Sequence, residues 1–270
     1  MFELNANESK KYGWEMFSGF QLKVIGIVLM VFDHLHQMFY VFGAPVWFTW
    51  LGRPVAPIFL FLSAEGYRHT RSKARYMLLL LAGFELMSAV SDVMTLSMRS
   101  DDLSLINNIF GTLFVSVLYM ALADLFMGAV REKNPGRFAL ALLSMLLPPA
   151  LGIAPLLMDE SMPFWLQIAM LKYIPNPVTV EGGFLFVLMG VLFHLFRDRR
   201  RVLAAIPVAY GIFSFFFIDG AQWLMAAAAL PILAYNGKRG PGGALAKYFF
   251  YAFYPAHICL FYIIAWRMSN

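Results

Sequence analysis

The chain has 270 residues, of which 60% are hydrophobic and only 14% are charged. A soluble domain carries about 25% charged residues, so this sequence has too few charges to cover a globular surface, and a soluble protein is excluded. The single cysteine excludes a disulfide framework and a cysteine-based metal cluster, and no metal site is predicted. The net charge of +5 does not indicate nucleic-acid binding, because the basic residues lie in short connections between apolar runs.

Apolar runs long enough to cross a bilayer core, about 20 residues as a helix, recur along nearly the whole chain. We therefore expect an all-α polytopic membrane bundle of about nine transmembrane helices, forming one domain over residues 1–270. We expect residues 21–41 to be an uncleaved first span, since no signal-peptide pattern precedes them. The predicted spans are residues 21–41, 47–67, 76–97, 105–128, 138–157, 183–196, 202–218, 221–235 and 248–266.

Alternate connections differ in basic residues, which predicts the orientation. The basic connections are Arg68–Arg75, Arg131–Arg137, Arg197–Arg201 and Lys238–Lys247. The connections poor in basic residues are Gly43–Pro45, Arg99–Asp102, Met158–Met162 and Asp219-Gly220. Placing the basic set in the cytoplasm puts the N-terminal segment 1–20 inside and the C-terminus outside. Residues 161–175 then cannot cross, and we predict a re-entrant or interfacial helix there on the outer face.

Ionisable side chains at membrane depth indicate a pair, a hydrated site or a function, because each costs about 2.5–3.5 kcal/mol on insertion scales. Asp33 and His34 lie about two-thirds along the first predicted span, Arg53 lies in the outer half of the second, and His257 is central in the last. Asp33 and Arg53 form either a structural ion pair or part of a site. The carboxylate beside His34 in sequence makes His34 the strongest functional candidate.

Three further polar residues share one helical face in the third predicted span: Glu85, Ser88 and Asp92. They form either hydrogen bonds between helices or a functional group, and the pattern does not separate these alternatives. His36 and His194 lie nearer the ends of their predicted spans and are interpreted as structural or interfacial residues.

Lys23 precedes His34 by eleven residues, which is three helical turns and roughly 16 Å along the axis. One end of this face lies at the predicted cytosolic surface and the other lies deep in the membrane. That arrangement suits an elongated cofactor with an anionic head and a reactive tail, such as an acyl-coenzyme A. Cations at the cytosolic ends of the spans would bind its phosphates: Lys23, Arg68, Arg71, Lys73, Lys238 and Arg239.

The sequence resembles the TraX family of membrane proteins over nearly its whole length. The matching stretches, in order, are Leu22-Lys23-Val24-Ile25 with Asp33-His34, Gly52-Arg53-Pro54 with Pro57-Ile58-Phe59, Ala64-Glu65-Gly66-Tyr67-Arg68-His69-Thr70 with Tyr76, Tyr235-Asn236-Gly237-Lys238-Arg239-Gly240, and Lys247-Tyr248-Phe249-Phe250-Tyr251 with Tyr254-Pro255-Ala256-His257. The family is associated with conjugative transfer, and its namesake acetylates the N-terminus of pilin. It is similar in turn to transmembrane acyltransferases in which a basic residue, ten residues and an essential histidine recur, as Lys23 and His34 do here.

The resemblance implies a bacterial cytoplasmic-membrane acetyltransferase that uses cytosolic acetyl-CoA. The implied catalytic residues are His34, Asp33, Arg53 and His257, with His34 as general base and either Arg53 or His257 stabilising the oxyanion. The implied acetyl-CoA-binding residues are Lys23, Glu65, Arg68, His69, Arg71, Asn236, Lys238 and Arg239. Direct transfer and an acetyl-histidine intermediate are both open.

The acceptor is also left open: it is a pilin-like or other peptide N-terminus, or a glycan hydroxyl. Membrane lipids are the other expected partners. Two alternative functions remain at this point. Buried charges also line the paths of transporters, and a non-enzymatic scaffold of a conjugation or secretion assembly would share the same membrane pattern.

Overall fold

The structure is a computed structural model that describes residues 15–98, 100, 108–157, 163–218 and 220–269. Within these ranges the regular structure is helical apart from one isolated bridge between Phe17 and Tyr235, which confirms the all-α prediction. Arg99, Asp102, the connection Met158–Met162 and Asp219 lie outside the described residues, as does most of the N-terminal segment 1–20.

The first helix, α1 (Gly19–Phe39), begins at Ser18, where the Ser18 and Gln21 side chains form a reciprocal capping box. A short 3-10 turn, η1 (Tyr40–Phe42), follows it. The single span predicted over residues 47–67 is wrong, because two helices, α2 (Trp47–Gly52) and α3 (Val55–His69), occupy this region. Pro54 stands at the break, where its missing N–H and the restriction it places on the preceding residue interrupt the helix.

The remaining elements follow the predicted spans to within a few residues. They are α4 (Lys73–Ser97), α5 (Ile109–Arg131), α6 (Pro135–Leu157), α7 (Phe164–Tyr173), α8 (Gly183–Leu195), α9 (Arg200–Phe217), η2 (Gln222–Ala228), α10 (Ala229–Leu233) and α11 (Ala244–Ser269).

Six helical segments of the described chain are long and apolar enough to cross a membrane, so the protein is a multi-pass membrane protein by length and composition. They are Gly19–Phe42, Lys73–Ser97, Ile109–Arg131, Pro135–Leu157, Arg200–Phe217 and Tyr248–Ser269. The nine predicted spans are therefore not confirmed. The helix α3 has 15 residues and α8 has 13, fewer than the roughly 20 that a complete crossing needs. The ten residues of α7 are also too few to cross.

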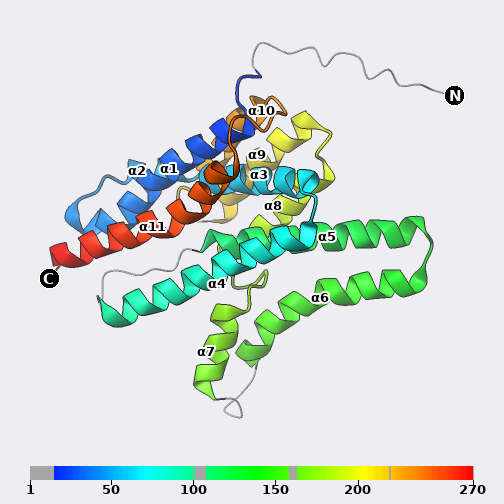
Figure 1. The fold of residues 1–270 in the computed structure, drawn as a ribbon, viewed down its shortest axis with the longest axis horizontal. Coiled ribbons are helices and arrows are strands. Elements are labelled where there is room, and N and C mark those ends of the chain that lie inside the picture. Colours follow the sequence, from blue (N-terminus) through cyan, green and yellow to red (C-terminus); the bar gives the residue numbers. More distant parts are fainter. Residues whose placement is uncertain (1–14, 99, 101–107, 158–162, 219, 270) are drawn as a thin grey trace.

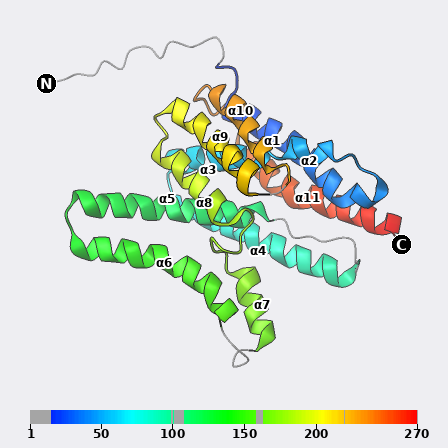
Figure 2. The same ribbon diagram turned by 180° about the vertical axis from the view of Figure 1, so that it is seen from behind.

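The helices form one bundle with a projecting pair (Figures 1 and 2). In both views α1 and α11 lie side by side, α3 and α8 lie in the middle, and α4 and α5 run along the other side of the bundle. The pair α6 and α7 projects from α5. The largest fully buried side chains of the core include Leu22, Ile58, Met120, Phe193 and Tyr262.

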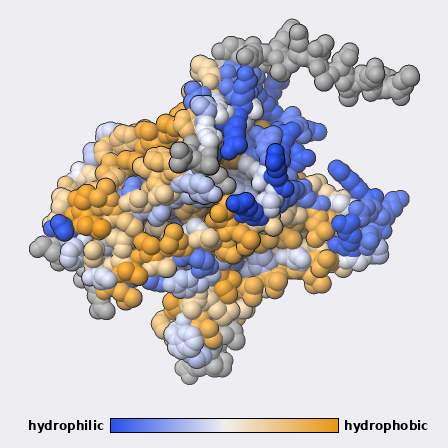
Figure 3. Space-filling model, viewed as in Figure 1, coloured by the Kyte–Doolittle hydropathy of each residue, from blue (hydrophilic) through white to orange (hydrophobic). Residues whose placement is uncertain are grey.

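Polar and apolar residues are segregated on the surface. In Figure 3 hydrophilic residues gather at the upper and right edges, and hydrophobic residues cover most of the left and lower surface. The four basic connections lie in this upper and right part, whereas η1 and the C-terminus lie at the opposite end (Figure 1). The basic connections therefore share one end of the molecule, as a common membrane side requires.

Candidate active site at the ends of the short helices

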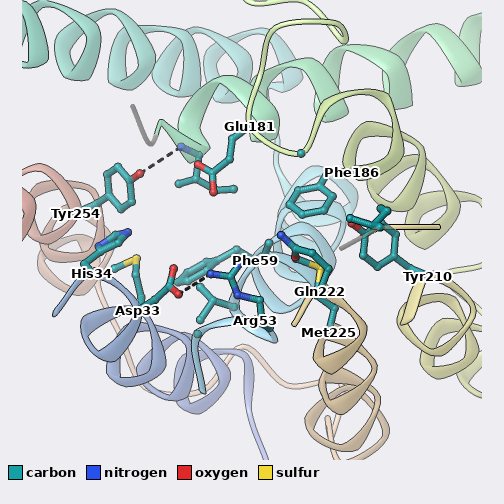
Figure 4. Close-up of a pocket in the computed structure, with 17 residues that line it drawn as sticks. Asp33, His34, Arg53, Phe59, Glu181, Phe186, Tyr210, Gln222, Met225 and Tyr254 are labelled. Carbon is teal, nitrogen blue, oxygen red and sulfur yellow. Dashed lines mark hydrogen bonds and ion pairs between the residues drawn. The ribbon is translucent and has the colours of Figure 1, made fainter. Parts of the chain in front are cut away.

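A cavity of about 170 Å³ lies among the short helices. Its walls come from α1, α2, α3, α5, α8, α9, η2, α11 and the segment that precedes α8 (Figure 4). The lining is apolar except for a small set of polar side chains: Asp33, His34, Arg53, Glu181, Tyr210, Gln222 and Tyr254. An apolar cavity with a few convergent polar groups is the usual form of a small-molecule site.

Three helices begin at this cavity. Val55 is the first residue of α3, Ile109 is the first residue of α5, and Gly182 directly precedes α8, and all three line the cavity. A helix N-terminus carries a partial positive charge of about +0.5 and unsatisfied N–H groups. The backbone therefore makes the cavity favourable for anionic groups.

His34 and His257 form a buried hydrogen-bonded pair. The two side chains are 4% and 5% exposed, and Nδ1 of His34 lies 2.7 Å from Nε2 of His257. The rings are stacked with their centroids 4.9 Å apart. The sequence named both residues as catalytic candidates without predicting their contact, which depends on the packing of α1 against α11.

The hydrogen bonds of this pair define the tautomers of two neutral rings. Nδ1 of His257 lies 2.6 Å from the carbonyl oxygen of Phe253, which can only accept, so this nitrogen donates. Nε2 of a neutral His257 must then accept the proton of Nδ1 in His34. Nε2 of His34 is left unprotonated, and His34 is the member of the pair that lines the cavity. The arrangement leaves an unprotonated ring nitrogen on a side chain that lines the cavity.

Asp33 and Arg53 form the ion pair that the sequence left as one of two alternatives. An Arg53 guanidinium nitrogen lies 2.9 Å from Oδ1 of Asp33, and the Thr49 hydroxyl donates to the same oxygen at 2.8 Å. Nε of Arg53 donates to the Thr49 carbonyl oxygen at 3.1 Å. Both charged side chains line the cavity beside His34 (Figure 4). The pair is therefore part of the site as well as a link between α1 and α2.

Gly52 explains how α2 approaches α1 so closely. A Cβ atom at this position would lie 2.3 Å from Cβ of Asp33, far inside van der Waals contact. Any larger residue would push the two helices apart and separate Asp33 from Arg53. The Gly-Arg-Pro sequence thus supplies a close contact, a charge and a helix break in three consecutive residues.

Glu181 is a site residue that the sequence analysis missed. It lies between α7 and α8, where the Thr112 hydroxyl donates to its carbonyl oxygen at 2.7 Å. The two following glycines, Gly182 and Gly183, have positive φ angles of 72° and 55°, which residues with a Cβ rarely adopt. Burial, with the Asp33 carboxylate as a smaller second cause, raises the pKa of Glu181 to about 7. The Glu-Gly-Gly turn was visible in the sequence but pointed only to a connection.

Tyr254 is the second missed residue. Its hydroxyl oxygen accepts a hydrogen bond from the N–H of Ile109 at 3.3 Å, and its ring meets the His34 ring edge-on, with centroids 5.9 Å apart. It therefore links the start of α5 to the histidine pair. The motif that contains His257 also contains Tyr254, so the family resemblance carried the only signal.

The residues proposed for cofactor binding gather where α1 begins and α3 ends. The carbonyl oxygens of Lys238 and Arg239 accept from the N–H groups of Gly19 and Phe20 at 2.8 and 2.9 Å. The Asn236 side chain accepts from the N–H of Lys238 at 2.9 Å. These contacts hold the loop after α10 against the first turn of α1. Lys23 lies one turn further along α1.

Side-chain contacts at the end of α3 complete this cationic end. Glu65 accepts from the Tyr235 hydroxyl at 3.3 Å and lies 3.6 Å from Nε2 of His69. Arg68 pairs with Asp198 at 3.1 Å, and Arg71 is exposed. The structure thus brings the proposed cofactor residues to one end, while His34, Asp33, Arg53 and His257 lie deeper along α1, α2 and α11.

The other polar candidates lie outside the cavity that His34 lines. Asp92 contacts Lys172 and Tyr173 of α7, and Glu85 is half-buried on α4. His36 bonds the carbonyl oxygen of Ala44 at 3.1 Å. His194 lies 2.8 Å from Asp124, in agreement with a structural interpretation of both histidines.

The fold and cavity define a polytopic helical membrane protein with a polar centre inside its bundle. The TraX protein family model matches residues 18–265, and the chain belongs to the TraX family. It is 30% identical over 256 residues to the probable fimbrial assembly protein FimC, serogroup H1, of Dichelobacter nodosus. The aligned region covers 90% of this chain and 94% of that protein. No solved structure gives a significant match.

Proposed function

We propose that the protein transfers an acetyl group from cytosolic acetyl-CoA to an amine or hydroxyl acceptor in a bacterial cytoplasmic membrane. The observation that carries the proposal is the hydrogen-bond chain from Phe253 through His257 to His34. This chain leaves an unprotonated ring nitrogen on His34, which lines the cavity. A buried base with a fixed tautomer is what general-base catalysis of acyl transfer needs.

In the proposed reaction, Nε2 of His34 accepts a proton from the acceptor as its nitrogen or oxygen attacks the thioester carbon. The His257 ring, which bonds the other nitrogen of His34, stabilises the imidazolium that forms. When the carbon–sulfur bond breaks, His34 returns the proton to the thiolate of coenzyme A. The sequence left an acetyl-histidine intermediate open, and the same geometry would allow His34 to attack the thioester directly.

The developing oxyanion would be stabilised by Arg53 and by the N-termini of α3, α5 and α8. Arg53 lines the cavity and is held in place by Asp33 and Thr49. Fixed donors and dipoles in a dry site stabilise transition-state charge without reorganisation, and removal of one such donor in other enzymes costs about 10²–10³-fold in rate.

The cofactor would enter from the cationic end. A cavity of about 170 Å³ resembles in size one of about 150 Å³ that holds benzene, so it accommodates the acetyl thioester and not the whole cofactor. The phosphates would remain near Lys23, Arg68, Lys238 and Arg239, and the positive-inside rule puts this end and the N-terminus in the cytoplasm.

The test is acetyl transfer from radiolabelled acetyl-CoA by purified protein in liposomes, with alaninamide and short peptides as acceptors. Replacing a general base typically lowers the rate by about 10²–10⁴-fold, so His34→Ala should lose transfer to that extent. The matched control is His36→Ala, two residues along α1, which should retain activity. Full transfer by folded His34→Ala would refute the proposal.

A non-enzymatic role in assembly is the second candidate, favoured by the name of the similar fimbrial assembly protein. It predicts that the purified protein does not bind acetyl-CoA and that a partner protein co-purifies with it. It also predicts that His34→Ala retains the assembly function in cells, whereas the acetyltransferase proposal predicts its loss wherever assembly needs acetylation.

A further inference from the structure

The cavity that His34 lines has two distinct ends. In Figure 4 His34 and Tyr254 lie at one end, and Phe186, Gln222 and Met225 lie at the other. The proposed transfer needs the attacking atom of the acceptor beside Nε2 of His34, because this nitrogen takes its proton. The leaving group of the thioester is then directed away from the acceptor, toward the end that holds Gln222.

Gln222 carries an unused hydrogen-bond acceptor at this end. Its Oε1 is buried and has no hydrogen-bond partner among the residues that the structure describes, and the residue lines the cavity. Phe186 and Met225 beside it are buried side chains without a donor. An unpaired buried acceptor is destabilising. The oxygen therefore indicates a ligand that supplies an N–H or O–H group at this point.

The position of Gln222 depends on a close contact between η2 and α9. Gln222 is the first residue of η2, a 3-10 helix of seven residues, whereas 3-10 runs longer than about 3–4 residues are uncommon. A Cβ atom at Gly211 of α9 would lie 2.7 Å from the carbonyl oxygen of Trp223, so only glycine allows η2 to pack this closely. The contact fixes the start of η2, and with it Gln222, at the cavity wall.

η2 also connects the cavity to the cationic end of the molecule. It continues directly into α10, and the two elements together are about 20 Å long at their usual rises. The loop after α10 carries Lys238 and Arg239, and their carbonyl oxygens are bonded to the start of α1. Both α1 and the η2–α10 segment contact α3. Gln222 and the proposed phosphate-binding residues therefore lie at two ends of one continuous segment, as His34 and Lys23 do on α1.

We propose that Gln222 recognises the pantetheine arm of acetyl-CoA by accepting a hydrogen bond from the amide N–H nearest the thioester. This inference rests on the proposed acetyl transfer and assigns the subsite of its donor. In acetyl-CoA two methylene groups separate this N–H from the sulfur, and neither the acetyl group nor the sulfur offers an earlier donor. Phe186 and Met225 would contact the methylene groups, and the rest of the arm would follow η2 and α10 to Lys238 and Arg239.

The hydrogen bond would orient the thioester for attack. It holds the sulfur on the Gln222 side of the acyl carbon and leaves the His34 side open to the acceptor. No covalent bond to Gln222 forms or breaks, so Gln222 is a donor-binding residue and leaves the choice of acceptor open. A thioester whose leaving group lacks this N–H should be a poor donor, because Oε1 of Gln222 then stays unpaired.

The first arm of the test compares two small acetyl donors that differ only at this N–H, S-acetyl-N-acetylcysteamine and its N-methyl derivative. Neither has phosphates, so Lys238 and Arg239 do not influence the comparison. With alaninamide as acceptor in liposomes, we expect the wild type to prefer the N–H donor about tenfold in kcat/KM, as 1.4 kcal/mol of selectivity would give. Gln222→Met should remove this preference. The matched control Gln167→Met, on α7 and outside the cavity lining, should keep it.

The second arm does not depend on turnover. A Gln222→Cys, Cys259→Ser chain is incubated with the methyl disulfide of coenzyme A, which resembles acetyl-CoA in shape. The new cysteine thiolate attacks the coenzyme A sulfur, methanethiolate leaves, and the resulting mixed disulfide with the protein is detected by its mass. We expect this adduct to form, to be suppressed by excess acetyl-CoA, and to form more slowly when Lys238→Ala and Arg239→Ala are added. The control Gln167→Cys should give no adduct that acetyl-CoA suppresses.

Three results would overturn the inference and leave the proposed acetyl transfer standing. They are equal use of the N–H and N-methyl donors by the wild type, a preference that survives in Gln222→Met, and absence of the adduct from folded Gln222→Cys. Absence of transfer from acetyl-CoA itself by the wild type would instead overturn the proposed function, and the assignment of Gln222 with it.

Discussion

The tautomer of His34 depends on His257, and this dependence can be measured. In His257→Leu the buried Nδ1–H of His34 loses its acceptor at 2.7 Å. An unsatisfied buried donor costs about 1–3 kcal/mol. If this cost falls on the reactive tautomer, the rate of acetyl transfer decreases about 5–150-fold, since 1.36 kcal/mol is tenfold in rate.

His257→Gln is the matched variant, because its amide oxygen can accept the same proton. We expect His257→Gln to retain most of the activity that His257→Leu loses. The assay is the initial rate of acetyl transfer to alaninamide in liposomes, with acetyl-CoA affinity measured by calorimetry on the same preparations. Affinity should be unchanged in both variants, because His257 lies outside the cavity lining and away from the cationic end.

Equal rates for His257→Leu and the wild type, in protein with unchanged thermal stability, would refute the reasoning. Equal losses in His257→Leu and His257→Gln would also count against it, because they would indicate a packing role for the ring and no role for its nitrogen.

Three further outcomes follow from the geometry. Gly52→Ala places a methyl group against Asp33, and such overpacking costs about 1–3 kcal/mol, so we expect a lower thermal midpoint in detergent and a weaker site; an unchanged midpoint would contradict the close contact. The pKa of Glu181 is raised from about 4.5 to about 7 by desolvation, so the folded state binds this proton more tightly than the unfolded chain; the thermal midpoint in detergent should fall as the pH rises from about 4.5 to about 7, and Glu181→Gln should flatten this decrease. Lys238→Ala with Arg239→Ala should weaken acetyl-CoA binding in calorimetry at least tenfold without changing the KM for alaninamide, and equal affinity would remove these residues from the cofactor entrance.

The elements that sequence predicts best here are long apolar helices. Six of the predicted spans correspond to helices that satisfy membrane length and composition, because a run of apolar residues is a local property. The sequence analysis did not predict the break at Arg53-Pro54, although a proline within an apolar run often interrupts a helix. Apolar residues continue on both sides of the break, so a search for apolar runs of membrane length extends one span through it.

The site was predicted in part because its charges are rare at membrane depth. Asp33, His34, Arg53 and His257 were each noticed on that ground, and the ion pair followed from opposite charge. The contact between His34 and His257 joins residues 223 apart in sequence, and no local pattern specifies it. Glu181 was not predicted because it lies in a connection, where a carboxylate is ordinary, and only the fold places it against the cavity.

The three helices that start at the cavity, α3, α5 and α8, have a consequence for how this family can diversify. Their partial charges belong to the backbone, so no single side-chain substitution removes the favourable field at the centre. Side chains such as Tyr210 can then change during evolution while the same polarisation persists. Under the proposed acetyl transfer, a new acceptor would require only a change in the side chains of the cavity wall, because the backbone supplies the electrostatic field.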